Sequence, residues 1–452
     1  MTEIASSEIS GRTRRWDTGQ LAWGVLLIAF AGFCVLCVIT GVGVNYFLFQ
    51  STVPMQTIVR VGRGTVTWSD ATLIPQATSS EIELFNSAMV RTDTVSQATL
   101  FVYDQYHDQL VATVTLKNDT SVDVRQVARP RFDFSTQGYL IELEDTTGEL
   151  DVHVPTAVQR DVMLVINTRQ NAVARFTRPG DYTIRANDNQ LLVNNYSGDA
   201  RVAIGENPNY AVPAGDRGIL DLAASSYSMQ PLSRLNLLGS GTFDASNVIS
   251  VNGGATPGER AWGCNNQQND MPSGFFALTQ MDGLDVLRLG RGGGAASHGE
   301  SFCSQYLVGG SGQQGYDISG YSYLGIRATF KIAGHSLSVC GSDGSECPLM
   351  LRMEYVPQNG SATTWYHGFF TRILAGFDSY PLTCDSCMLP HDIVNENGWY
   401  TYDSGNLLPL FQPGQRPVSL LNFRFYASGH EYDVYISDMA LIVGQANATP
   451  VG

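Results

Sequence analysis

Five aromatic residues in the C-terminal half are the side chains whose types and spacing best suit ligand binding: Trp365, Tyr366, Trp399, Tyr400 and Tyr402. Sugars offer hydroxyl groups and flat apolar faces, so sugar sites combine exposed aromatic rings with hydrogen-bonding side chains. Histidine, aspartate and asparagine residues lie close to these aromatics in the sequence. A strand that carried the aromatics would also bury one face, so core packing is the alternative for each. We treat the five as candidate ligand contacts.

Motifs that would indicate catalysis are missing from the sequence. It contains no G-x-S-x-G, no H-E-x-x-H and no phosphate-binding G-x-x-x-x-G-K-[ST]. The glycine-rich stretch at residues 290–301 lies between two apparent strands with no helix after it, which favours a surface loop. We therefore expect no enzyme activity. A glycan-cleaving enzyme is the alternative, because a pair of carboxyl groups across a cleft cannot be recognised from sequence.

The cysteines divide by location. Cys34 and Cys37 lie in an apolar N-terminal run, and the other six follow residue 263: Cys264, Cys303, Cys340, Cys347, Cys384 and Cys387. An even number in an exported segment indicates disulfides. The short spacings favour Cys340 with Cys347 and Cys384 with Cys387, which leaves Cys264 for Cys303. A zinc or redox site is the alternative, since Cys384 and Cys387 form a C-x-x-C.

The elements that must position these side chains are short strands. Hydrophobic and polar residues alternate along many segments, as at residues 150–154, and turn residues separate the segments at intervals of about ten. Before residue 230 and after the apolar run, no helical pattern exceeds about two turns. The fold class expected for the exported part is therefore all-β.

The N-terminal run at residues 21–49 has no charged side chain and is long enough to span a bilayer as a helix. Arg12, Arg14 and Arg15 precede it, so we expect residues 1–20 to form a cytoplasmic tail and the rest to be exported. A cleaved signal peptide is the alternative, but the run is longer than a secretory core and no small-residue cleavage site follows it. An uncleaved signal anchor in the cell membrane is predicted.

Composition limits the partners. The net charge is −15 and no cluster of lysine and arginine offers a phosphate-binding stripe, so nucleic acid is excluded as a partner. With 43% hydrophobic residues, 15% charged residues and 46 glycines, the chain is typical of folded, turn-rich β-structure. Its length predicts two exported domains. We place them at residues 57–222 and 235–444, with a small, polar linker at 223–234 and a tail at 445–452.

The first exported domain resembles the FecR-like family. The resemblance rests on VRVGRGTVTW at residues 59–68, MVRTDTVSQATLFVYD at residues 89–104 and a closing pattern that ends in AVPAGDRG. It implies a β-structure of stacked hairpins on the far side of a membrane helix, and the best known members relay a signal inward to a sigma factor. About 20 residues precede the helix here, too few for the folded cytoplasmic module of such a relay.

The second domain is similar to galactose-binding-like jelly-roll sandwiches that often accompany carbohydrate-active enzymes. It opens with LNLLGSGTFDAS at residues 235–246 and closes with EYDVYISDMALIVG at residues 431–444. This resemblance implies carbohydrate binding. Related sandwiches often hold calcium near the first and last strands, where Asp244 and Asp438 stand, so a structural calcium ion is an expectation. No other cofactor is expected.

The leading hypothesis is a membrane-anchored, non-catalytic binding or adhesion protein whose distal sandwich contacts glycan or envelope material. The alternative is a transmembrane signalling or envelope-assembly component that acts through protein partners.

Overall fold

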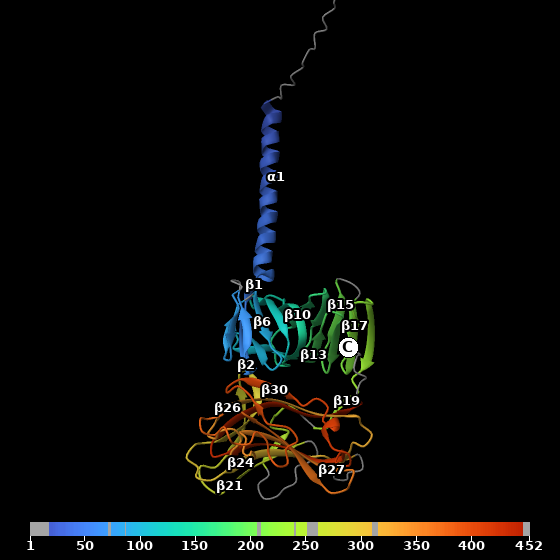
Figure 1. The fold of residues 1–452 in the computed structure, drawn as a ribbon. Helices are drawn as coiled ribbons and strands as arrows, with labels where there is room; N and C mark the ends of the chain where they lie inside the picture. Colours follow the sequence, from blue (N-terminus) through green and yellow to red (C-terminus); the bar gives the residue numbers. More distant parts are fainter. Residues whose placement is uncertain are drawn as a thin grey trace, which may run out of the picture. The chain divides into compact units, whose positions relative to one another are not determined.

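The computed structural model describes residues 18–70, 74–85, 87–205, 209–238, 241–250, 261–309 and 315–445. Its one long helix, α1 (Thr18–Asn45), continues into a short π-helix, η1 (Tyr46–Gln50) (Figure 1). Of the described helices, this one alone is long and apolar enough to cross a membrane, and an 18-residue stretch within Leu21–Gln50 has a mean hydropathy of 2.8. The predicted tail at residues 1–20 and the predicted tail at 445–452 lie almost wholly outside the described residues.

The end of this helix forms a compact unit with residues 130–137. The Phe47 ring packs edge-on against Phe132, and the Phe49 ring packs in the same way against Phe134. The Ser135 hydroxyl donates a hydrogen bond of 2.7 Å to the Phe49 carbonyl. These contacts hold the helix end within its own unit.

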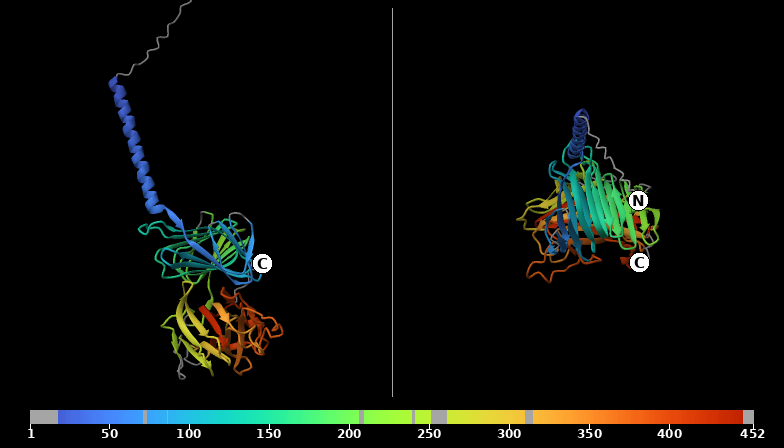
Figure 2. Two further views of the ribbon diagram at one scale, coloured as in Figure 1. Left: turned by 90° about the vertical axis from the view of Figure 1, so that its left-hand side faces the viewer. Right: turned by 90° about the horizontal axis from the view of Figure 1, so that it is seen from above.

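In the second unit, residues 54–129 and 138–452, the described residues form mainly β-structure (Figure 2). The short strand β1 (Thr52–Pro54) precedes it in the chain. The N-terminal part of this unit contains the strands β2 (Gln56–Arg63), β3 (Val66–Ser69), β4 (Gln76–Thr78), β5 (Ile82–Leu84), β6 (Ala88–Thr92), β7 (Gln97–Asp104), β8 (Gln109–Leu116), β9 (Ser121–Pro130), β10 (Tyr139–Val154), β11 (Val162–Thr168), β12 (Ala172–Phe176), β13 (Gly180–Ala186), β14 (Gln190–Asn195), β15 (Ala200–Ile204), β16 (Asn209–Val212), β17 (Asp216–Asp221) and β18 (Ser226–Pro231).

The long strand β10 joins the two ladders of this N-terminal β-structure. Its first half pairs with β9 and β11, and its second half pairs with β8 and β13. Gly148 lies at the change and has φ +97°, and a Cβ there would come within 2.4 Å of the Thr120 hydroxyl. Only glycine fits such a position without strain. Alternate residues such as Val162, Leu164 and Ile166 fill the core between the ladders.

The C-terminal part is a jelly-roll β-sandwich. Its strands are β19 (Arg234–Asn236), β20 (Val248–Ser250), β21 (Trp262–Gln268), β22 (Phe275–Met281), β23 (Leu284–Arg291), β24 (Gly299–Tyr306), β25 (Tyr316–Asp317), β26 (Tyr323–His335), β27 (Leu349–Pro357), β28 (Thr363–Phe370), β29 (Asp392–Ile393), β30 (Trp399–Asp403), β31 (Pro417–Gly429) and β32 (Tyr432–Gly444), with a 3-10 turn, η2 (Leu408–Leu410). One sheet runs β22-β23-β32-β26-β30, and the other runs β20-β21-β24-β31-β27-β28-β29. The predicted all-β class with one N-terminal helix is confirmed.

The segment predicted as a linker, residues 223–234, contains a strand. β18 pairs along its whole length with β17, and β19 starts at Arg234 and pairs with β32. The side chains of β18 are mostly exposed, because it lies at the edge of its ladder. An edge strand that faces water needs no alternation of apolar residues, so the small, polar sequence of β18 did not indicate a strand. The two-domain division itself stays a prediction.

The N-terminal β-structure, from β2 to β18, is called the first β-structure below. It shares a buried contact with the C-terminal sandwich. Phe101 and Leu110 from the first β-structure pack with Val286, Trp399 and Tyr435 of the sandwich. Beside this cluster, the Asp282 carboxylate lies 2.7 Å from a guanidinium nitrogen of Arg60 and 3.0 Å from the Lys331 ammonium group. The contact therefore combines apolar packing with a buried network of charges.

Candidate functional site

The candidate site is the outer face of the sheet that contains β24, β31, β27 and β28. Residues of these strands point alternately to the two sides of the sheet. Cys303, Phe425, Leu351 and Trp365 belong to the sandwich core. Their neighbours along each strand therefore face outward.

The strand register arranges the outward residues in rows across the sheet. One row is Phe302, Tyr426, Met350 and Gly368; the next is Ser304, Arg424, Arg352 and Tyr366; the third is Tyr306, Asn422, Glu354 and Thr364. Directly opposed residues on one face lie close enough to interact. Each row therefore combines side chains from strands far apart in the sequence.

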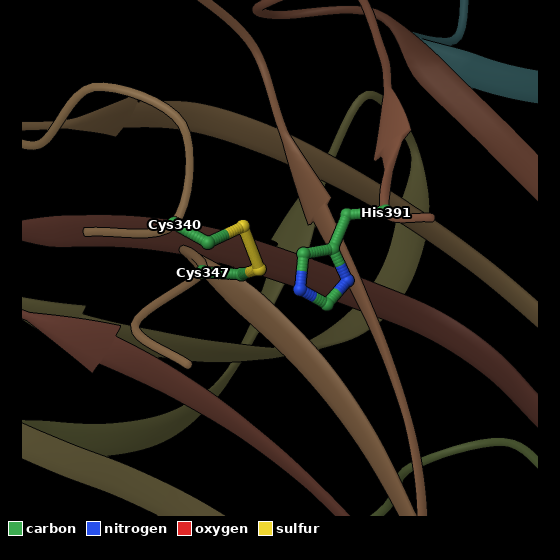
Figure 3. Close-up of side chains that lie close together, drawn as sticks. All are labelled: Cys340, Cys347 and His391. Carbon is green, nitrogen blue, oxygen red and sulfur yellow. A yellow bond between two sulfur atoms is a disulfide. The ribbon is translucent and has the colours of Figure 1, made fainter. Parts of the chain in front are cut away.

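The loop closed by the Cys340–Cys347 disulfide packs against the first row. Met350 and Tyr426 pack with Cys340 and Cys347, and a Cβ added to Gly368 would lie 2.2 Å from the Cys347 sulfur. Figure 3 shows that disulfide beside the His391 ring. Burial raises the pKa of the Tyr426 phenol above its usual value. The first row is therefore covered by this loop and does not face solvent freely.

The second and third rows carry aromatic and hydrogen-bonding groups with partial exposure. Tyr306 is 38% exposed, and Tyr366, Arg352 and Glu354 are each half-buried. Arg352 donates a short hydrogen bond to Glu354, and its guanidinium group lies over the Tyr366 ring at 5.9 Å. Aromatic faces beside fixed polar groups suit the apolar faces and hydroxyl groups of sugars.

The five predicted aromatics fall into different places. Tyr366 alone lies on this outer face. Trp365 and Trp399 are each 1% exposed, and Tyr400 and Tyr402 are 6% and 5% exposed. Alternation turns Trp365 into the core, and β30 carries the other three in the opposite sheet, paired with β26. These four rings present no face to solvent, so burial contradicts a ligand contact for them.

Trp399, Tyr400 and the neighbouring Thr401 serve the contact with the first β-structure instead. The Trp399 indole donates a hydrogen bond of 2.8 Å to the Asp282 carboxylate. The Tyr400 hydroxyl accepts one of 3.1 Å from Arg63, and the Gln97 side chain bonds both backbone groups of Thr401.

The two predicted calcium ligands lie on neighbouring segments. The Met439 amide, next to Asp438, donates a hydrogen bond of 2.9 Å to the Gly241 carbonyl, three residues before Asp244. The Asp244 carboxylate already accepts hydrogen bonds from the Ser246 hydroxyl and from the amides of Ser246 and Asn247, and these lower its pKa. Burial raises the pKa of Asp438. Calcium at this position stays a prediction.

The predicted cysteine pairing is confirmed. Disulfides join Cys264 to Cys303, Cys340 to Cys347, and Cys384 to Cys387. Among the described residues, two groups of three side chains come close enough to hold a metal, and each consists of a disulfide and His391. The His391 ring already bonds the Gly344 carbonyl through Nε2 and accepts from the Gly368 amide through Nδ1. Disulfide sulfurs are not thiolates, so these groups are structural.

His298, at one end of the face, gives a pH-dependent prediction. Glu300 and then Glu346, at 3.7 and 3.1 Å, raise the pKa of His298 to about 9. A raised folded-state pKa stabilises the fold fully below the unfolded value, about 6.5, and this contribution is lost as pH rises through about 9. We expect the melting temperatures of the native chain and of His298→Gln to differ most near pH 6 and to converge by about pH 10. A constant difference across that range would contradict the assignment.

Sequence reasoning missed Phe302, Tyr306, Arg352 and Arg424. The available signal was the unusual alternation in LLNFRFYA, where Arg424 stands between two core phenylalanines. Such an arginine must lie on the face opposite the core.

Comparisons with known proteins give only distant likenesses. No protein-family model matches the chain, and no curated protein matches it. A structure from Parabacteroides distasonis assigned as an anti-sigma factor is 14% identical and covers 34% of this chain and 68% of its own, with a TM-score of 0.24. A family 11 carbohydrate-binding module from Clostridium thermocellum is 12% identical and covers 41% and 91%, with a TM-score of 0.23. A xylan-binding domain from Paenibacillus barcinonensis is 10% identical and covers 42% and 88%, with a TM-score of 0.21. At these scores the likenesses identify neither a family nor a ligand for this chain.

Proposed function

We propose that this chain is a single-pass membrane protein whose C-terminal sandwich binds cell-surface or envelope polysaccharide without cleaving it. The observation that carries the proposal is the outer face of the second sheet. There, Tyr366 and Tyr306 stand half-exposed in the rows that carry the Arg352–Glu354 pair. A flat sheet face with rings and fixed polar groups can follow an extended polymer over several sugar units.

The membrane placement rests on the apolar helix and on the disulfides. The helix is long enough to span, and disulfides persist in oxidising compartments outside the cytoplasm. The arginines that precede the helix in the sequence favour a cytoplasmic N-terminus. We accordingly place the β-structures on the outer side of the membrane.

The charges on the face support binding without cleavage. A glycosidase needs one carboxyl group able to donate a proton and a second across the bond that it cleaves. Here Glu354 is paired with Arg352, and Glu300 lies 3.7 Å from His298. Each of these carboxylates thus lies beside a basic side chain.

The test is binding of the full chain, held in nanodiscs, to a panel of neutral and acidic polysaccharides. We expect Tyr366→Ala to weaken binding to the retained polymer about tenfold, because the ring face that packs on a sugar is lost. Tyr196→Ala is the matched control, since Tyr196 is 39% exposed but lies in the first β-structure. Equal affinity in the native chain and in Tyr366→Ala would refute the proposed face.

A second function, signalling or assembly through protein partners, is favoured by the contact between the two β-structures. The Asn395 amide group donates to the carbonyls of Val61, Gly64 and Ser79, so force on the sandwich would reach the first β-structure directly. If deleting residues 1–20 abolished the phenotype of the intact gene while membrane insertion persisted, a cytoplasmic relay would gain support.

A further inference from the structure

Arg424 is a half-buried cation without a counter-ion. It lies in the second row of the outer face, opposite Ser304 on one side and Arg352 on the other. Its guanidinium group stacks over the Phe302 ring at 3.9 Å. Its side chain makes no hydrogen bond or ion pair with any residue that the structure describes, and the covered Nε atom has no acceptor.

The surroundings of Arg424 make this charge costly. Burial and the adjacent Arg352 both lower the pKa of Arg424, and Glu300 and Glu354 offset that only in part. Glu354 is already bound to Arg352, whose own Nε is also covered and without an acceptor. Half-buried charges are normally paired, because desolvation without a partner is unfavourable. The free protein therefore holds positive charge on this face that a ligand could neutralise.

We propose that the polysaccharide bound on this face is acidic, and that Arg424 binds its carboxylate or sulfate groups. This inference rests on the proposed function. A guanidinium group presents paired N–H donors that match both anions, and the stacked Phe302 ring fixes its plane. The net charge of −15 repels a polyanion overall, so the attraction must be local to this face.

The experiment measures binding of the full chain in neutral-lipid nanodiscs to polygalacturonate, dextran sulfate and neutral xylan. Arg424→Gln should weaken binding to the acidic polymer at least about tenfold and leave any binding to xylan unchanged. Arg424→Lys, which keeps the charge but loses the paired donors, should fall between. Arg288→Gln is the control, because Arg288 also lies over a ring, Phe275, at 5.3 Å, but in the other sheet.

Polygalacturonate and dextran sulfate distinguish a carboxylate from a sulfate ligand. Salt supplies a readout that needs no variant: binding through Arg424 should weaken as NaCl rises from about 50 to about 500 mM, since charge pairs are screened. If the chain bound only xylan, and if Tyr366→Ala weakened that binding while Arg424→Gln did not, the inference would be overturned and the proposed function would stand. Salt-independent binding, or equal losses on neutral and acidic polymers, would overturn it as well. No binding to any polymer would overturn both.

Discussion

Asp282→Asn should destabilise the β-structures by about 3 to 5 kcal/mol, because it leaves the buried Lys331 ammonium group without its anion and removes one of the two carboxylates that pair with Arg60. The Asp282 carboxylate lies 2.7 Å from Arg60, 3.0 Å from Lys331 and 2.8 Å from the Trp399 indole nitrogen. All three charged side chains are at most 13% exposed. Asparagine keeps the shape and tolerates the left-handed backbone at this position, φ +55°, so the substitution isolates the charge.

Denaturant unfolding of the full chain in micelles, followed by tryptophan fluorescence, measures this effect. Trp399 reports directly, because its indole is bonded to Asp282. The matched control is Asp285→Asn, three residues away, where the exposed carboxylate accepts a hydrogen bond from the Gln280 amide and should contribute little. If both variants unfolded at the same denaturant concentration, the Asp282 network would not stabilise the contact.

The same network should make the contact sensitive to acid. Burial opposes ionisation of Asp282, but Arg60, the Trp399 hydrogen bond and Lys331 together lower its pKa below the usual value. A lowered folded-state pKa contributes stability that is present above the unfolded pKa, about 3.9, and is lost as pH falls through the folded value. The stability difference between the native chain and Asp282→Asn should therefore shrink below about pH 4.

Local sequence patterns predicted strands and disulfides of the fold. Alternation at residues 150–154 predicted a strand, and this segment is the second half of β10. The cysteine spacings predicted all three disulfides. Both signals are local, because they depend on residues within one strand or one loop.

Predicting the residues of the candidate site requires the order and register of the strands, which a local sequence pattern does not contain. A cluster of aromatics drew attention to residues 365–402, yet the strand direction decides that Trp365 is core while Tyr366 faces outward. The row that joins Ser304, Arg424, Arg352 and Tyr366 depends on the order and register of four strands. Trp399 is buried against Phe101 and Leu110 of the first β-structure, 298 and 289 residues earlier in the chain, and no periodicity indicates this contact.

Removing the disulfide between Cys264 and Cys303 should destabilise the sandwich by about 4 kcal/mol, the value expected in the chain-entropy model for a closed loop of about 39 residues. The two cysteines are directly opposed on β21 and β24, and both are fully buried in the sandwich core. The cross-link therefore restricts the unfolded chain across the whole of β22 and β23. Its loss should lower the denaturation midpoint of the double variant Cys264→Ala, Cys303→Ala.

The matched comparison is the double variant Cys384→Ala, Cys387→Ala, which opens a loop with a separation of only 3 residues. The same model gives about 2 kcal/mol for it, because a short loop has little closure entropy to lose. Denaturant unfolding of both variants in micelles, under identical conditions, should show that removing Cys264–Cys303 lowers the free energy of unfolding by about 2 kcal/mol more than removing Cys384–Cys387 does. The reverse order would mean that the outer loops stabilise the sandwich mainly through packing. Cys384–Cys387 lies beside His391, whose ring bonds the Gly368 amide in the first row of the candidate face, so that result would link the loops to the site.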